Sequence, residues 1–578
     1  MKGKILWLGA VFFLIAAMLL SSCTTKSTTI NATTPAVQTP QYGGTLNVFT
    51  AQAATNPTGW DHPMASNMAG GAIWGNPYLE MLVTGDVEKY GPSGTNQFAF
   101  NLYEGVPESY LGGGLASSWE INVGPPLTYT WHLRKGVMWT GNTNIGMASR
   151  ELTADDVVFS EKRAKARPGF ESSMAWLANV SAPDKYTVVW ECSSFYNRWA
   201  WRMGGTVIGQ IWAHESVDAG PNDWRNAVGT GPFILTDYIE GSAATYSRNP
   251  KYWGTTTING KVYQEPFIDK LTYSIIPDES TQIAAVRTGK IDWDPKVALT
   301  YQQTLASTTP NLIQAKYLNN TIDIMAFNRA NADSVLSNLK IRRALMIGTD
   351  LQAIANLVYN GGVVYTWPVT PGGEGFIPQD QLPASQKELW TYDPVKAKQM
   401  IADAGYPNGF PILIELGPVD SQQQVAEVLV SMWAKIGVKV TIKTVDTAAL
   451  ATLRANGTWK DCTFQSSTVV SLLTSLGYAS ATGSMVTYRA NDPLGFDAMF
   501  KQASAEVDPV KRVAELKVLS LGMMDDAARI AFANPYVLNC YWPWMKNYFG
   551  EIDASYYNQM PMIKRMWIDQ NLKTSLTK

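Results

Sequence analysis

The clearest alternation of apolar and polar positions lies in the last third of the chain. Residues 393–405 predict a helix, because Asp393 can cap its start, Pro394 fits its first position and Gly405 can end it. Between these limits, apolar residues recur at the spacing of one helical face. They are Ala397, Met400, Ile401 and Ala404.

The same region continues with a strand, a helix and a second strand. The run PILIEL (411–416) predicts a short strand, and residues 425–436 repeat apolar side chains at helical spacing before Gly437. Residues 438–442, VKVTI, then alternate between apolar and polar types, which is typical of a strand with one polar face. This order predicts an α/β unit with a sheet at its centre.

Residues 44–300 show a different pattern. Short β-type runs such as LTYTWHL (127–133), YTVVWEC (186–192) and LTYSII (271–276) are separated by Gly, Pro and Asn, and no repeat of fixed period occurs. A chain of 578 residues is too long for one hydrophobic core, so about three or four domains are expected.

One short stretch, LTADDVVFS (152–160), places two aspartates side by side. Thr153 followed three residues later by Asp156, ahead of an apolar run, matches a capping box, so a helix is expected to start there. Neighbouring residues on a helix point about 100° apart. Asp155 and Asp156 are therefore interpreted as structural residues and not as a catalytic pair.

The N-terminal residues resemble an export signal. Two lysines precede an apolar run from Ile5 to Leu20, which is marginal for a membrane span and typical of a secretory leader. The sequence LSSC that ends at Cys23 resembles the lipobox of bacterial lipoproteins, in which the cysteine is diacylated; an ordinary leader with an incidental cysteine is the alternative. Residues 1–22 are thus expected to be a lipoprotein signal peptide, and residues 23–41, rich in Thr and Pro, a disordered tether.

Composition limits the possible partners. The net charge is -2 and only 16% of residues are charged, whereas a chain that grips phosphates usually carries a basic excess, so no nucleic-acid partner is expected. Downstream of the leader no apolar run is long enough to cross a membrane. Of the remaining cysteines, Cys192, Cys462 and Cys540, two could pair in an oxidising compartment, or all three could be buried thiols.

Motifs of common enzymes are missing from the sequence. There is no GxSxG and no P-loop, and the dipeptide His214-Glu215 is followed by Asp218 where a zinc protease needs its second histidine. The other two histidines, His62 and His132, are far from His214 in the sequence, so we expect no metal site, no cofactor and no enzymatic activity.

An ordered series of motifs resembles one known family. LASSWE (115–120), TYTWHLRKGVMW (128–139) and LTADDVVFS (152–160) stand in the order and at the gaps typical of the family 5 extracellular solute-binding proteins of ABC transporters. The resemblance continues from there and covers the chain from Tyr42 to its end. Its further segments are VGTGPF (228–233), RNPKYWG (248–254), IPDESTQ with TGKID (276–292), KIRRAL (340–345), DPVKAKQMIADAGYPNGF (393–410) and WAKIGVKV (433–440).

The resemblance implies an α/β fold, namely a two-lobed clamp of the periplasmic-binding-protein type II with an additional β-rich subdomain, closing about a hinge on its ligand. It also implies a monomer, anchored outside the cytoplasm by lipid, that passes its ligand to an ABC permease driven by separate ATPase subunits. The implied segments are residues 42–76, 206–314 and 536–578 for lobe I, 77–205 for the extra subdomain and 315–535 for lobe II.

The resemblance also directs attention to one tract of lobe II. Peptide-binding members hold the peptide's α-amine with an aspartate in this tract, because a desolvated ammonium needs a paired carboxylate. Here Asp461 fits the earlier strand position, but SSTVV (466–470) stands where the tryptophan and the amine-binding aspartate are expected. This departure argues against recognition of a free amine. We predict that Ser466, Ser467 and Thr468 bind the ligand through their hydroxyls.

The sequence contains 21 tryptophans, which are also consistent with a sugar-binding protein, because sugar rings stack on aromatic side chains. Many belong to family motifs or helix faces and are expected in the core. Trp60, Trp74 and Trp367 are the best candidates for ligand contact, because the resemblance places them in loops near the cleft. The function predicted is capture of a small ligand, foremost an oligopeptide, for import. An oligosaccharide is the alternative ligand, and a secreted hydrolase or a sensory binding protein is the alternative outside transport.

Overall fold

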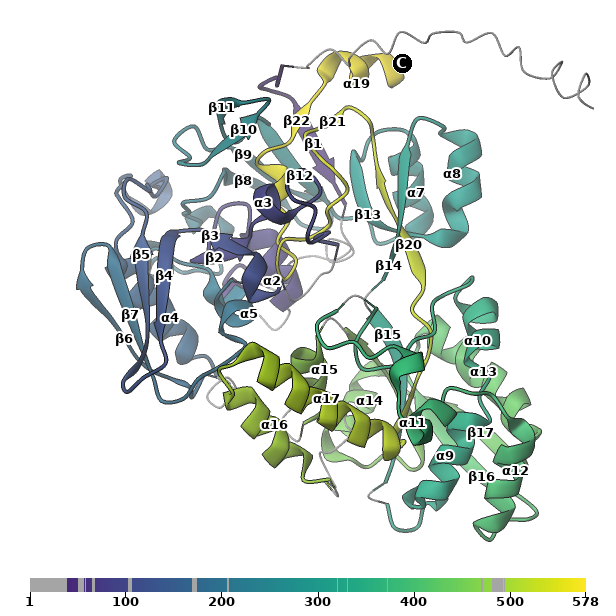
Figure 1. Cartoon of the computed structure of the whole chain (residues 1–578). Coiled ribbons are helices and arrows are strands. Elements are labelled where there is room, and N and C mark those ends of the chain that lie inside the picture. Colours follow the sequence, from purple (N-terminus) through teal and green to yellow (C-terminus); the bar gives the residue numbers. More distant parts are fainter. Residues whose placement is uncertain are drawn as a thin grey trace, which may run out of the picture. The chain divides into compact units, whose positions relative to one another are not determined.

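Three β-sheets of seven, five and four strands organise the residues described by the computed structural model (Figure 1). These residues are 39–49, 57, 59–64, 68–101, 106–168, 174–204, 207–319, 321–329, 331–371, 373–468, 471–480, 492 and 494–577. The segment from Gln41 to Lys578 forms one compact unit by itself. The predicted signal peptide and nearly all of the predicted tether lie outside the described residues.

The seven-stranded sheet gathers strands from distant parts of the chain, in the order β14-β20-β13-β1-β12-β9-β8. β1 pairs in parallel with β12 and β13, whereas β8, β9, β14 and β20 add antiparallel pairs. The strands are β1 (Thr45–Val48), β8 (Phe233–Ile239), β9 (Ala243–Arg248), β12 (Lys270–Ser274), β13 (Trp293–Ala298), β14 (Ile313–Leu318) and β20 (Tyr536–Tyr541).

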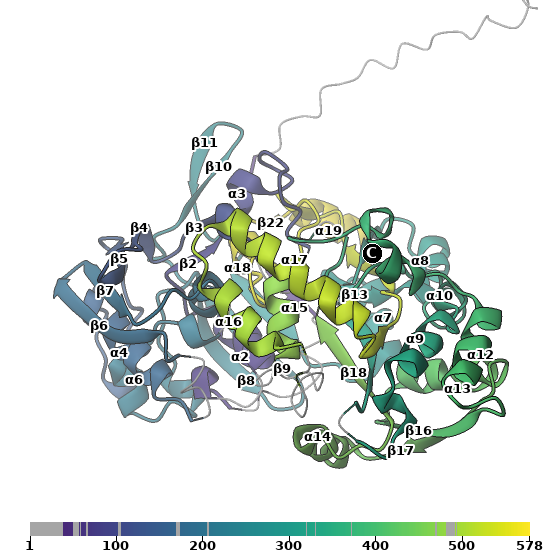
Figure 2. The ribbon, with the colours of Figure 1, turned by 60° about the horizontal axis from the view of Figure 1, so that its bottom comes forward.

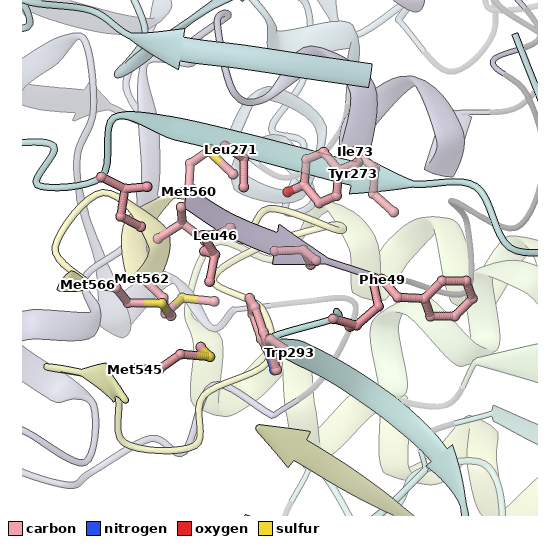
Figure 3. Packing of buried hydrophobic residues seen from close by; sticks show 14 of the residues in the cluster. Leu46, Phe49, Ile73, Leu271, Tyr273, Trp293, Met545, Met560, Met562 and Met566 are labelled. Atoms are coloured by element: carbon pink, nitrogen blue, oxygen red, sulfur yellow. The ribbon is translucent and has the colours of Figure 1, made fainter. Parts of the chain in front are cut away.

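The core beneath this sheet joins the start of the chain to its end. Leu46 of β1 and Leu271 of β12 are fully buried and share one cluster with Trp293 of β13. Figure 3 shows these side chains beside methionines of the C-terminal segment, among them Met545 and Met562. Lobe I therefore depends on residues from both ends of the described chain.

The four-stranded sheet is antiparallel, in the order β4-β5-β7-β6, and α4 packs on it (Figure 1). Its elements are β4 (Ala116–Asn122), β5 (Leu127–Leu133), α4 (Ala154–Lys165), β6 (Leu177–Asp184) and β7 (Thr187–Cys192). The predicted capping box is confirmed, because α4 begins after Thr153, whose backbone N–H donates to Asp156 Oδ2 at 2.9 Å. Asp156 is buried and also accepts two hydrogen bonds from Arg150.

The five-stranded sheet, in the order β17-β16-β18-β15-β19, contains the α/β unit predicted from the sequence. Asp393 caps α12 by accepting a hydrogen bond from the Lys396 N–H at 2.9 Å. The strand, helix and strand that follow are also found, and β16 and β17 are parallel. The elements are α12 (Pro394–Asp403), β15 (Thr321–Phe327), β16 (Phe410–Leu416), α13 (Asp420–Ala434), β17 (Val438–Thr444), β18 (Cys462–Thr468) and β19 (Arg529–Ala531).

The chain passes between the seven-stranded and the five-stranded sheet twice, between β14 and β15 and again between β19 and β20. The two crossings lie side by side, and a hydrogen bond joins them: the Asn319 N–H donates to the Pro535 carbonyl at 3.0 Å. The Asn534 side chain donates to the Asn319 carbonyl at 2.5 Å. The predicted domain boundary at residue 314 falls inside β14, and the crossing comes after that strand.

The remaining elements are short or flank these sheets. In the first half they are η2 (His62–Met64), α2 (Met68–Gly75), β2 (Val83–Gly85), α3 (Val87–Tyr90), η3 (Glu108–Tyr110), β3 (Leu111–Gly113), η4 (Thr143–Ile145), α5 (Trp199–Gly204), η5 (Val207–Gly209), α6 (His214–Asp218), η6 (Trp224–Asn226), β10 (Thr255–Ile258), β11 (Lys261–Gln264) and α7 (Glu279–Arg287). From residue 299 onward they are η7 (Leu299–Tyr301), α8 (Gln302–Thr308), η8 (Val335–Ser337), α9 (Leu339–Ile347), α10 (Leu351–Val358), η9 (Gln379–Gln381), α11 (Ala384–Glu388), α14 (Thr447–Asn456), α15 (Leu472–Ala479), α16 (Phe496–Ala505), α17 (Pro509–Asp525), β21 (Met545–Lys546), α18 (Met560–Ile563), β22 (Trp567–Ile568) and α19 (Gln570–Leu576). Helices α15 and α16 both pack on the long helix α17 (Figure 2).

The three cysteines of the described chain are free thiols, and Cys462 and Cys540 are buried whereas Cys192 is partly exposed. Burial raises the pKa of all three thiols. Within the described residues no helix has both the length and the apolar character needed to span a bilayer.

Candidate functional site

The predicted ligand-binding serines lie on β18, in the middle of the five-stranded sheet. Ser466 stands opposite Asp323 of β15 in an antiparallel ladder. Its hydroxyl donates to Asp323 Oδ1 at 2.8 Å and accepts from Gln422 Nε2 at 3.1 Å. Ser466 is exposed, and two hydrogen bonds already engage its hydroxyl.

Asp323 is the centre of a polar network that ties four elements together. Its Oδ1 also accepts from Gln422 Nε2 at 3.0 Å, and its Oδ2 accepts from the Tyr359 hydroxyl at 3.0 Å and the Ser421 hydroxyl at 2.7 Å. Asp323 is only 8% exposed. The network joins β15, β18, the end of α10 and the start of α13.

The negative charge of Asp323 is held by neutral groups. In the described part of the chain no Lys, Arg or His forms an ion pair with it, so its four hydrogen-bond donors stabilise the carboxylate. Ser421 and Gln422 also lie in the first turn of α13, where the helix dipole favours negative charge. Burial and this carboxylate raise the pKa of Tyr359 well above its ordinary value, so its hydroxyl stays a donor at neutral pH.

Sequence reasoning missed Asp323. Its only signal is one carboxylate in the otherwise apolar run TIDIMAF (321–327), since a buried acid needs several partners. Those partners come from residues that are 36 to 143 positions away along the chain. Local pattern therefore does not reveal them.

The other residues of the tract have different surroundings. Ser467 is buried on β18, and Thr468 ends that strand opposite Thr321; Val469 and Val470 lie outside the described residues. Asp461, at the strand's start, accepts from the Ser334 hydroxyl at 2.6 Å and from the Leu413 N–H at 2.9 Å. Asp461 is thus occupied by structural hydrogen bonds, and the ligand-binding role of the serines and Thr468 stays a prediction.

The three predicted tryptophans belong to two different hydrophobic clusters. Trp60 and Trp74 lie in the core of the seven-stranded sheet, and Trp367 packs with residues of α15, α16 and α17. Trp74 is 1% exposed and lies on α2, where the sequence suggested a loop. The glycine-rich run MAGGAIWG lacks an amphipathic pattern, because this helix is buried around most of its circumference.

Trp367 is 3% exposed, and the Arg529 guanidinium lies over its ring at 4.5 Å from the centroid. Arg529 belongs to a buried group in which Asp526 pairs with Arg329 at 2.8 Å and with Arg342 at 2.7 Å. A cavity of about 20 Å³ beside Trp367 has room for roughly one water molecule. In this conformation Trp367 offers little surface to a ligand.

Trp60 has the most open surroundings of the three. It is 6% exposed and its ring meets Tyr238 edge-on at 5.1 Å. Both rings border an open hollow of about 470 Å³. Nearby, His62 is fully buried with Nε2 3.0 Å from the Tyr78 hydroxyl, and burial lowers the pKa of His62 to about 3, which keeps its ring neutral. The described residues contain no group of three or more His, Cys, Asp or Glu side chains arranged to hold a metal ion.

With this architecture established, comparison with known proteins identifies the class. Residues 111–487 match the model of the bacterial extracellular solute-binding proteins, family 5. The chain belongs to this family. Its fold is the two-lobed α/β clamp with an additional β-rich subdomain, as the sequence predicted.

Individual relatives are similar over part of their length. The heme-binding protein A of Haemophilus influenzae is 32% identical over 355 residues, which are 56% of this chain and 60% of that protein. The dipeptide-binding protein of Escherichia coli is 29% identical over 363 residues, which are 57% of this chain and 63% of that protein. The aligned regions thus span less than two thirds of either relative.

Solved structures resemble the chain over nearly its full length. HbpA2 from Haemophilus parasuis superposes with a TM-score of 0.72 at 23% identity, covering 91% of this chain and 100% of that one. DppA from Helicobacter pylori, solved with the peptide STSA, gives a TM-score of 0.68 at 21% identity, covering 92% and 99%. At this identity the likeness shows the fold alone.

Proposed function

We propose that this protein is a lipid-anchored extracytoplasmic receptor that captures a small peptide between its lobes and delivers it to the permease of an ABC importer. Relatives named as dipeptide-binding and di/tripeptide-binding proteins support the ligand class. A solved structure of the same fold that contains a peptide supports it too. The permease and its ATPase would be separate subunits, and the receptor would work as a monomer.

The observation that carries this proposal is the paired crossing between the two larger sheets. Each sheet has its own hydrophobic core, and the chain joins them only through neighbouring segments at Asn319 and Pro535 within the described residues. Two bodies linked by two adjacent segments can rotate about them while both cores stay packed. Such a hinge supports capture by closure.

The β18 tract bears on how the peptide's N-terminus is recognised. From Cys462 to Ala490 the sequence has no Asp or Glu, and Asp461 is engaged by Ser334 and Leu413. A desolvated ammonium would find no carboxylate in this tract. We therefore expect a short peptide and its N-acetylated form to bind with similar affinity. Calorimetric titration of both forms tests this, and loss of binding on acetylation would mean that a carboxylate elsewhere holds the amine.

The ligand class itself is tested by mass spectrometry of the small molecules released when the freshly purified protein is denatured. Recovered peptides are expected. Recovery of hexose oligomers would instead support the alternative, that the ligand is an oligosaccharide. Thermal stabilisation by the ligand without its consumption separates a receptor from a hydrolase, because a ligand that binds only the folded state raises the free energy of unfolding.

The anchor is tested at Cys23. Labelled fatty acid should be incorporated into the wild-type protein but not into Cys23→Ser, and this variant should appear in the soluble extracytoplasmic fraction. Equal labelling of both proteins would reject lipidation at this cysteine.

A further inference from the structure

An open hollow on the seven-stranded sheet combines aromatic rings with unused polar groups. It has a volume of about 470 Å³, within the range of roughly 300–1,000 Å³ found for small-molecule sites. β8, the edge strand of this sheet, borders it with Tyr238, and the chain just beyond that strand adds Glu240. The rest of the border consists of Trp60, which contacts Tyr238, and residues 222–225.

A second open hollow of about 660 Å³ shares Trp224 and Arg225 with the first as bordering residues. The second hollow is lined by the loop 140–149 and by residues 234–236 of β8. Its border is rich in Thr, Asn and Ser. Both hollows are bordered by residues of the edge strand β8, and the two are together called the groove below.

The aromatic rings of the groove are held in place by packing. Trp60 and Tyr238 meet edge-on, with ring planes at 72°. Trp60 is almost fully buried, whereas Tyr238 and Trp224 are partly exposed. Partly exposed rings in a concave surface give a ligand ring a flat apolar face to stack on.

The polar groups supply both donors and acceptors. Asp223 Oδ1 accepts from the Arg225 backbone N–H at 3.0 Å and from its Nε at 2.8 Å, which fixes the guanidinium beside Trp224. The Asn222 side chain accepts from the Asp61 N–H at 3.3 Å, and its own N–H groups donate to no residue that the structure describes. Glu240 is exposed and, within the described part of the chain, has neither an ion pair nor a hydrogen bond.

This charge pattern selects a class of ligand. Asp223 and Arg225 neutralise each other, so a cation would meet the guanidinium and an anion would meet Glu240. A neutral ligand that carries many hydroxyls suits the groove better, because each hydroxyl can donate to a carboxylate and accept from a guanidinium or amide.

We propose that this groove is a second binding site, separate from the interlobe ligand site, that takes a short neutral oligosaccharide. Trp224 stacks on one sugar ring, and Glu240 and Arg225 bind its hydroxyls. The site does not depend on the proposed peptide function, because Trp224, Arg225 and Glu240 lie outside both the β18 tract and the paired crossing.

The test uses the full purified chain with cellotriose and maltotriose as probes, followed by saturation-transfer NMR and calorimetry at millimolar sugar. Saturation of sugar protons is expected for at least one probe. Trp224→Ala and Glu240→Gln should each weaken its binding about tenfold. Phe549→Ala and Glu120→Gln, which change an exposed aromatic and an exposed acid elsewhere, should leave the affinity unchanged.

Three results would overturn the proposal. They are no saturation of either sugar, equal binding by the wild type and both groove variants, and binding of choline to the same residues in place of the sugars. Thermal melts identify a Trp224→Ala protein that fails to fold, and Glu240→Gln then decides, because Glu240 is exposed. Peptide titrations of the same variants should match the wild type, so failure of the sugar site and failure of the peptide function give different results.

Discussion

The Asp323 network allows a quantitative test of how the second lobe is held together. Asp323→Ala removes the acceptor of four hydrogen bonds. Ser421 is partly exposed and Ser466 is exposed, so both can turn toward water, but Gln422 and Tyr359 are buried. An unsatisfied buried donor costs about 1–3 kcal/mol. Two of them predict a loss of about 3 kcal/mol in the free energy of unfolding of this lobe.

The assay is thermal unfolding of the full chain, in which about 3 kcal/mol corresponds to a fall in melting temperature of about 6–12 °C for a lobe of this size. Asp323→Asn should cost less, about 1–2 kcal/mol, because the Tyr359 and Ser421 hydroxyls can turn and accept from the new amide. Asp333→Ala is the matched control, since Asp333 is exposed in the same lobe, and it should change stability by less than about 0.5 kcal/mol.

Two results would refute this reasoning. If Asp323→Ala has the same melting temperature as the wild type, the network adds no stability. If Asp323→Asn keeps the wild-type melting temperature but loses affinity for the peptide, the carboxylate binds the ligand. The second result would also explain how a chain without the expected aspartate in its β18 tract could hold an amine.

Three further substitutions test other parts of the structure. Burial raises the pKa of Glu161 from 4.5 to about 8, and its carboxyl oxygens have no hydrogen-bond partner in the described chain. Glu161→Met removes this buried acid and should therefore raise the free energy of unfolding by about 3 kcal/mol at neutral pH. The folded state then holds a proton that the unfolded state releases, so wild-type stability falls as pH rises from 4.5 to about 8; urea titrations should show this slope in the wild type and not in the variant. Asp156→Ala removes a helix cap and both hydrogen bonds from Arg150. Urea titration should show a loss of about 3 kcal/mol in the free energy of unfolding, compared with less than about 0.5 kcal/mol for the control Asp155→Ala, since Asp155 is exposed. Equal losses for the two variants would contradict the capping geometry. Lys573→Met removes the ammonium group that lies 2.6 Å from the buried Asp292 carboxylate. The free energy of unfolding should fall by about 3–5 kcal/mol, and α19 should be digested faster by a protease. An unchanged rate of proteolysis would count against this ion pair.

The sequence predicted those parts of the fold that short segments determine by themselves. The cap at Asp393, the helix start after Thr153 and the strand-helix-strand unit all depend on residues within a few turns of one another, and the structure has each of them. The clamp as a whole was predicted from an ordered series of motifs, and not from periodicity. Periodicity cannot show which distant strands join one sheet.

The candidate site was harder to predict because its partners are distant in sequence. The sequence predicts that the hydroxyl of Ser466 binds the ligand, which stays a prediction; its hydrogen bond to Asp323 could not be predicted, because Asp323 lies 143 residues earlier in the chain. The resemblance placed the candidate tryptophans in loops near the cleft, yet Trp74 is on a buried helix and Trp367 packs in the interior. A side chain's surroundings depend on the tertiary pairing of its element, which local composition does not contain.

The position of β20 in its sheet has a consequence for the order in which the lobes can be completed during synthesis. β20 lies between β14 and β13, and β14 joins the sheet only through it among the described strands. All five strands of the second sheet precede β20 in the chain. The second lobe can therefore finish its sheet on the ribosome or at the export channel, whereas the first lobe, although its opening strand is made early, must wait for the last segment of the chain. A ribosome that stops before residue 536 would release a protein with one finished lobe, while the other would lack the strand that joins β14 to β13.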